Sequence, residues 1–101
     1  MYAMMTQWQA DESQYETLRT KLQTEIAPRV QRAPGFIEGY FVWDHATGKA
    51  YDLILFETEE QARAEKTTVE QLPQPDAPVR FELARVVEVA AHAKGAVATN
   101  A

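Results

Sequence analysis

The sequence predicts an α+β domain with four strands and two helices, and three observations support that class. Four short segments are rich in the β-branched, aromatic and other apolar residues that are typical of strands. Apolar residues recur at helical spacing in a fifth segment, and a helix-start pattern opens a sixth. Proline and glycine separate the segments at 34–35 and again across 72–79, where a helix cannot continue.

The first strand and the first helix occupy residues 2–30. Residues 2–9 alternate between two faces and predict a strand. The period then changes, and an apolar stripe at helical spacing predicts a helix from about residue 11. Asp11 and Ser13 are candidate caps, and Pro28 is expected to kink or end this helix. The stripe consists of Tyr15, Leu18, Leu22, Ile26 and Val30.

Residues 34–57 predict a β-hairpin whose two arms, 36–44 and 50–57, are apolar on both faces. The arms are joined by residues 45–49, in which Gly48 suits a left-handed conformation. A three-residue loop would pair Trp43 with Tyr51 and Phe41 with Leu53, and a loop one residue different would shift this register. Because the hairpin has no polar face, it must be covered on both sides.

The second helix and the last strand complete the domain. Thr58 and Gln61 form a capping box that opens a helix through about residue 72, and its charged residues predict a solvated face. The last strand, 79–89, is again two-sided, and simple alternation places Phe81, Leu83 and Val87 on one face. We therefore expect a single domain over residues 1–90 and a flexible tail over 91–101.

This order of strand, helix, strand, strand, helix, strand predicts a ferredoxin-like βαββαβ sandwich with an antiparallel four-stranded sheet. In that fold the last strand lies beside the first, the third strand lies on the other side of the first, and both helices cover one face. The other face is apolar and uncovered, and a patch of that size marks an interface. The prediction is a homodimer that closes into an α+β barrel.

Composition excludes several functions. The net charge is −5 and the ten basic residues are scattered, which argues against nucleic acid as a partner. The chain has no cysteine, so disulfides, thiolate catalysis and sulfur-ligated metals are unavailable. No apolar run approaches the roughly 20 residues that span a membrane, and no basic segment precedes an apolar core at the N-terminus. We expect a cytoplasmic protein without membrane contact.

Three short motifs carry a family resemblance. They are Pro34-Gly35-Phe36 before the hairpin, the run LILFETEE over 53–60 and the run FELARVV over 81–87. With the element order, they resemble the antibiotic-biosynthesis-monooxygenase-like family of dimeric α+β barrel proteins across residues 2–90. Its members include oxygenases that convert polycyclic hydroquinones to quinones without metal or flavin, haem-degrading enzymes, isomerases and decarboxylases. The motifs are structural, so the resemblance implies the fold more than the activity.

The haem-degrading members differ from this chain. They carry an Asn on the first strand and a Trp and a His near the second helix, whereas this chain has Thr6 and Gln7 on its first strand and neither Trp nor His within 58–72. The resemblance therefore implies no cofactor. It favours a small cofactor-independent monooxygenase-like protein acting on an apolar aromatic or polyketide-like molecule, and the alternative is a noncatalytic ligand-binding or structural dimer.

Aromatic residues on the strands are the candidate substrate-binding residues. Trp8, Phe41 and Trp43 would line a flat apolar pocket, and Tyr51 would donate a hydrogen bond to the substrate. In the alternative interpretation these rings fill the core or the dimer interface. The choice between them depends on whether a cavity exists beside the rings.

Charged residues within apolar strands must be paired or must serve a site, and Asp52, Glu38 and Arg85 are such residues. Arg85 would stabilise an anionic oxygen, so Tyr51 and Arg85 are the predicted catalytic residues; the alternative for Arg85 is an ion pair across the dimer interface. The two histidines, His45 and His92, fall in a turn and in the tail. Because no carboxylates converge on them, we predict no metal site.

Overall fold

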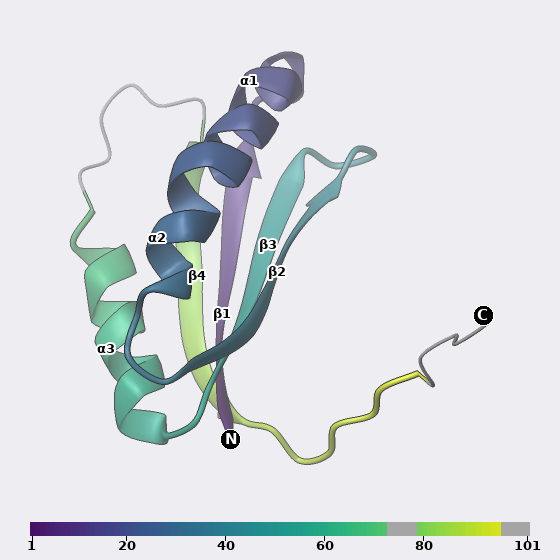
Figure 1. The fold of residues 1–101 in the computed structure, drawn as a ribbon. Coiled ribbons are helices and arrows are strands. Elements are labelled where there is room, and N and C mark those ends of the chain that lie inside the picture. Colours follow the sequence, from purple (N-terminus) through teal and green to yellow (C-terminus); the bar gives the residue numbers. More distant parts are fainter. Residues whose placement is uncertain (73–78, 96–101) are drawn as a thin grey trace, which may run out of the picture.

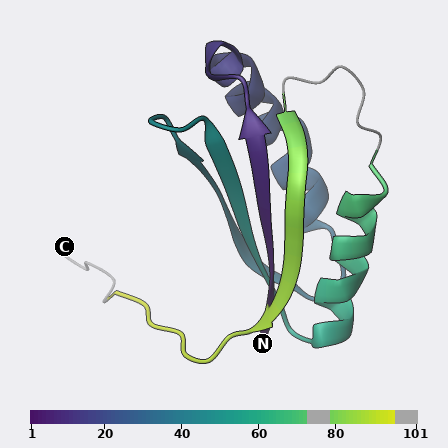
Figure 2. The same cartoon turned by 180° about the vertical axis from the view of Figure 1, so that it is seen from behind.

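The computed structural model describes residues 1–72 and 79–95, which form a four-stranded antiparallel sheet with helices on one face (Figure 1). The strand order is β2-β3-β1-β4, as predicted for a ferredoxin-like fold. The elements are β1 (Tyr2–Ala10), α1 (Tyr15–Lys21), α2 (Ala27–Gln31), β2 (Phe36–Asp44), β3 (Lys49–Phe56), α3 (Glu59–Glu70) and β4 (Val79–Glu88). Seen from behind, the described residues place no helix on the other face of the sheet (Figure 2).

The first helical segment is continuous but changes its winding in the middle. A 3₁₀ turn, Glu12–Gln14, leads into α1, and the π-helical turn Leu22–Ile26 joins α1 to α2. Pro28 lies at the start of α2. A proline ring clashes with the carbonyl four residues earlier and has no N–H to donate, and the wider π turn accommodates both effects. The predicted kink therefore takes the form of a π-helical turn, and the helix continues beyond it.

Helix α3 begins with the predicted capping box. The Thr58 hydroxyl accepts from the Gln61 backbone N–H at 3.2 Å, and the Gln61 side-chain oxygen accepts from the Thr58 N–H at 3.1 Å. Ala62 and Val69 are buried, whereas Leu72 is 40% exposed. The sparse apolar stripe thus anchors α3 at two positions, which is enough to hold it against β1, β3 and β4.

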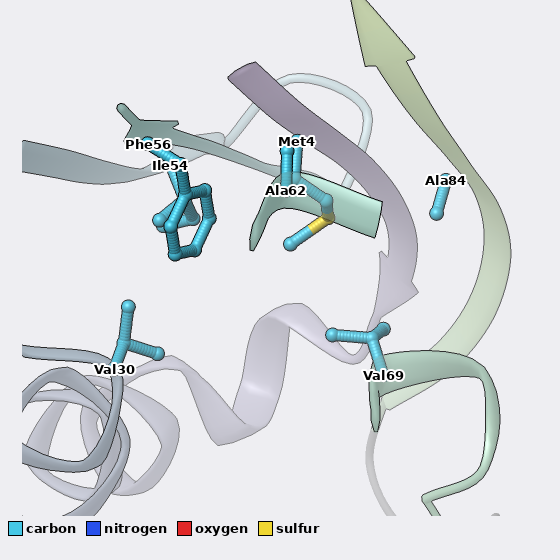
Figure 3. Close-up of a cluster of buried hydrophobic side chains, with 7 residues drawn as sticks. All are labelled: Met4, Val30, Ile54, Phe56, Ala62, Val69 and Ala84. Carbon is cyan, nitrogen blue, oxygen red and sulfur yellow. The ribbon is translucent and has the colours of Figure 1, made fainter. Parts of the chain in front are cut away.

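The core lies between the sheet and the helices (Figure 3). Met4, Ile54 and Phe56 are its largest fully buried side chains, and all three come from the two central strands. The remaining members of the cluster are Val30 of α2, Ala62 and Val69 of α3, and Ala84 of β4. This face of the sheet, which we call the inner face, also carries the candidate site residues described below.

The hairpin register differs from the predicted one. Trp43 pairs with Ala50, Phe41 with Asp52 and Val42 with Tyr51, so the predicted pairing of Trp43 with Tyr51 is wrong. The loop is one residue longer because Gly48, at φ 73°, closes it by donating to the Asp44 carbonyl at 2.8 Å. A shift of one residue moves a side chain to the other face of the sheet.

A β-bulge changes the predicted faces of β4 as well. The register between β1 and β4 shifts at Gln7 and Trp8, so Trp8 pairs with Phe81 while Gln7 pairs with Leu83. The predicted grouping of Phe81 with Leu83 is therefore wrong. Phe81 joins Trp8 on the inner face, with ring centroids 5.2 Å apart, and Leu83, Arg85 and Val87 face the other way.

The face of the sheet opposite the helices, which we call the outer face, carries large apolar side chains that are 37–54% exposed. A salt bridge at 2.8 Å between Lys49 of β3 and Glu82 of β4 crosses the same face. The exposed apolar residues are Met5, Tyr40, Val42, Tyr51, Leu53 and Val87. The segment after β4 reaches this face where His92 Nε2 lies 3.1 Å from Glu38 Oε1 of β2.

Parts of two predicted segments lie outside the described residues, namely 73–78 of the proline-rich connection and 96–101 of the tail. Residues 91–95 follow β4 without helix or strand. Within the described ranges, the helices are too short and too polar to span a membrane.

Candidate functional site

A cavity of about 650 Å³ lies between the inner face of the sheet and the first helical segment. The sheet contributes aromatic rings to its wall, and the helical segment contributes aliphatic side chains, among them those of the π-helical turn. The principal apolar lining residues are Trp8, Phe41, Trp43, Leu18, Leu22 and Ile26. The cavity has the size and the apolar lining that small-molecule sites commonly have.

The structure brings together three of the five predicted site residues. Trp8, Phe41 and Trp43 all line the cavity. Tyr51 and Arg85 do not, because they lie on the outer face, where Tyr51 pairs with Val42 and Arg85 with Met5. The longer turn moved Tyr51 away from Trp43. The Arg85 guanidinium donates to the neighbouring Ala84 carbonyl at 3.0 Å, and neither predicted catalytic residue reaches the cavity.

Asp52 is the polar residue that the sheet places in this cavity. It pairs with Thr6 across β1 and β3, and its Oδ2 accepts from Trp8 Nε1 at 3.3 Å. The same N–H also points to the Thr6 hydroxyl at 2.9 Å. Burial raises the pKa of Asp52 to about 6, hydrogen bonds from Thr6 and Trp8 oppose that rise, and the Glu65 charge adds to it.

Glu65 of α3 faces the cavity although the sequence predicted a solvated helix face. The pairs Glu59–Arg63 and Lys66–Glu70 lie on the exposed side of the helix, as predicted, but Glu65 is only 6% exposed. Its Oε2 accepts from Arg29 of α2 at 3.3 Å. The prediction was wrong for Glu65 because the residues three positions before it and four positions after it, Ala62 and Val69, are the buried positions of α3.

We call the exposed end of the cavity, where the hairpin turn meets the start of α1, its mouth. Glu12 joins them: Oε1 accepts from Trp43 Nε1 at 2.8 Å, and Oε2 lies 2.8 Å from His45 Nδ1. These two contacts, His45 first, lower the pKa of Glu12. The Tyr15 ring stands edge-on to both Trp43 and His45, with centroids 5.0 and 4.6 Å away. Glu12 thereby fixes the orientation of a ring that lines the cavity.

The described lining residues form no grouped metal site. Within the described residues, no three His, Asp or Glu side chains are grouped as a metal site. His45 is the imidazole among the described lining residues, and its side chain is 57% exposed at the mouth and bonded to Glu12. Among the described lining residues, Tyr15 and Met4 are further residue types that ligate haem iron in other proteins. The absence of a cofactor therefore stays a prediction.

Comparison with known proteins identifies the fold. No protein-family model and no curated protein matches the sequence. Solved structures that share the fold include the heme-degrader MhuD of Mycobacterium tuberculosis with two hemes bound in its active site, at TM-score 0.70 and 11% identity, covering 93% of this chain and all of that one. A monooxygenase from Streptomyces coelicolor, from the gene ActVA-Orf6, in complex with nanaomycin D aligns at TM-score 0.58 and 14% identity, covering 93% and 92%.

A dimeric ferredoxin-like protein from an uncultured marine organism aligns at TM-score 0.62 and 13% identity, covering 93% of this chain and 98% of that one. At these identities the likeness is one of fold. The chain therefore has the ferredoxin-like α+β fold seen in a monooxygenase and a heme-degrader, and the predicted resemblance is confirmed at that level. The chemistry of this cavity has to be argued from its own residues.

Proposed function

We propose that the protein is a small monooxygenase-like catalyst that binds an apolar aromatic molecule in the inner-face cavity and needs no bound cofactor. One observation carries the proposal: an aromatic-lined cavity of about 650 Å³ holds a carboxyl group, Asp52, whose pKa lies near 6. A carboxyl group in a cavity that served only packing would destabilise the fold, because a charged group loses its hydration there. Perturbed groups in apolar cavities are typical of functional sites.

Oxygen chemistry without a cofactor requires that the substrate supply the electrons. A hydroxyarene with a free ring position does so: its O–H and ring C–H bonds are lost, one oxygen atom becomes a new carbonyl, and the other leaves as water. The reaction balances without a further reductant. The protein would contribute orientation between the sheet and the helices, exclusion of water and a fixed polar partner for the hydroxyl group.

Oxygen uptake with a panel of hydroxynaphthalenes and hydroquinones tests this proposal. Wild type is expected to accelerate uptake for at least one compound above the rate without protein. Tyr51→Phe is the matched control, because Tyr51 faces away from the cavity, and it should keep the wild-type rate. If every compound reacts equally fast with and without protein, the oxygenase proposal is wrong. Binding without turnover would favour the noncatalytic alternative.

We further propose that the outer face is covered by a second copy of the chain. The support is the row of exposed apolar residues described above, together with the shared fold of a dimeric protein. Leu53→Asp places a charge within that row and should convert the dimer to a monomer in light scattering. Thr67→Asp, on the exposed side of α3, is the control and should remain dimeric. A wild-type monomer at micromolar concentration contradicts the proposal.

A cytoplasmic location stays a prediction.

A further inference from the structure

We infer that Asp52 is the proton acceptor of the cavity, that Thr6 and Trp8 position it, and that Glu65 is a positioning residue that acts through it. The inference rests on the proposed function for its place in a reaction, and it is tested by ligand binding as well as by turnover. None of these roles follows from the shared fold, because they depend on the register of this hairpin and on the Glu65 side chain facing the cavity.

The geometry of the strands supports the role of Asp52. Its Oδ2 accepts from an indole N–H at 3.3 Å, and the buried Thr6 lies directly across from it on β1. Both partners belong to β1, one of the two central strands, and Asp52 itself lines the cavity from the other central strand, β3. Phe41, its partner on β2, also lines the cavity. An aromatic ligand against Phe41 would bring its hydroxyl group beside Asp52.

The proton step is simple and balanced. The hydroxyl O–H bond of the bound molecule breaks, the proton moves to a carboxylate oxygen of Asp52, and the electron pair stays on the ligand oxygen. A ring carbon of this electron-rich anion then bonds to molecular oxygen, and the proton on Asp52 moves to the outer oxygen to give a hydroperoxide. Loss of the ring C–H proton together with cleavage of the O–O bond leaves the new carbonyl, and the outer oxygen departs as water with both protons. A base with a pKa near the working pH is well suited to this transfer, and the pKa of Asp52 lies near 6.

Several charged or titratable groups share the cavity with Asp52. They are Tyr15, Arg19 and Lys21 of α1, Arg29 of α2, His45 of the hairpin turn and Glu65 of α3. Of these, Glu65 is the charge that raises the pKa of Asp52. Arg29 pairs with Glu65 and holds its carboxylate in place. Removal of the Glu65 charge is therefore expected to lower the pKa of Asp52.

Binding of 1-naphthol, followed by tryptophan fluorescence between pH 4.5 and 8, tests the acceptor role without oxygen chemistry. Its methyl ether, 1-methoxynaphthalene, is the matched ligand without a proton to donate. Wild type should bind naphthol about tenfold more tightly above pH 7 than at pH 4.5, since a hydrogen bond to a charged acceptor is stronger, and should bind the ether equally at both. Asp52→Asn should remove the pH dependence, and Glu65→Gln should move its midpoint to lower pH.

The turnover arm uses the same variants. Asp52→Asn should lower the rate of oxygen uptake by at least about 100-fold, as is typical for loss of a general base. Tyr51→Phe should not change it. The inference is wrong if Asp52→Asn keeps the full rate, or if naphthol binding still depends on pH in this variant. It is also wrong if wild type binds naphthol and its ether equally. If binding behaves as expected but no compound consumes oxygen, the oxygenase proposal fails while the acceptor role stands.

Discussion

Replacing Asp52 by Asn is expected to stabilise the protein at neutral pH. The pKa of Asp52 is about 6 in the folded protein, against 3.8 for an ordinary aspartate. Because the folded state binds this proton more tightly than the unfolded state, the contribution of Asp52 to stability is fully present below pH 3.8 and is lost as the pH rises to about 6. Each pKa unit is worth about 1.4 kcal/mol, so the loss above pH 6 is about 3 kcal/mol.

Urea unfolding of wild type and Asp52→Asn at pH 4 and pH 7.5, followed by tryptophan fluorescence, measures this effect. The asparagine variant does not titrate at this position, and all other groups are common to both proteins. Its free energy of unfolding relative to wild type should therefore rise by most of that 3 kcal/mol between the two pH values. A difference that is the same at both, or that falls with pH, refutes the assignment of Asp52 as a partly buried carboxyl group with a raised pKa.

Three further substitutions test the supports of the site by equilibrium unfolding. Arg29→Met leaves Glu65 buried without its cation and should lower the free energy of unfolding by about 1–2 kcal/mol at pH 7. The loss is smaller than for a fully buried pair because the Arg29 side chain is 41% exposed. Arg29→Lys should recover part of the lost stability, and an unchanged stability in Arg29→Met would show that the ion pair does not stabilise the site. Gly48→Ala forces a Cβ into a left-handed residue, at φ 73°, and should cost about 1–2 kcal/mol, whereas a neutral result would mean that the turn relaxes. Thr58→Ala removes the α3 cap and should cost about 1 kcal/mol, with Thr58→Ser close to wild type.

The sequence predicted the fold well because its elements depend on local patterns. The change of period after residue 11, the capping box at Thr58 and the break at Pro34 each define an element boundary without reference to the rest of the chain. The order of these elements then leaves few topologies, and the observed sheet order is the predicted one.

The site was harder to predict because it depends on register. One extra residue in the turn at Gly48 places Asp52 on the inner face and Tyr51 on the outer face. The bulge beside Trp8 places Phe81 and Leu83 of β4 on opposite faces. Neither changes the hydrophobic pattern along the chain, since both faces of these strands are apolar. A charged residue inside an apolar strand was the available signal, and it pointed to Asp52 as well as to Arg85.

The most direct test of the proposed site is the ionisation of Asp52 itself, followed by the ¹³Cγ resonance of labelled protein in NMR titrations with and without 1-naphthol. In the free protein the midpoint is expected near pH 6. Naphthol should move this midpoint to lower pH, because its hydroxyl group favours the ionised carboxylate, and the methyl ether should not. A midpoint near 3.8 in the free protein, or one that naphthol leaves unchanged, would contradict a cavity built around this carboxyl group.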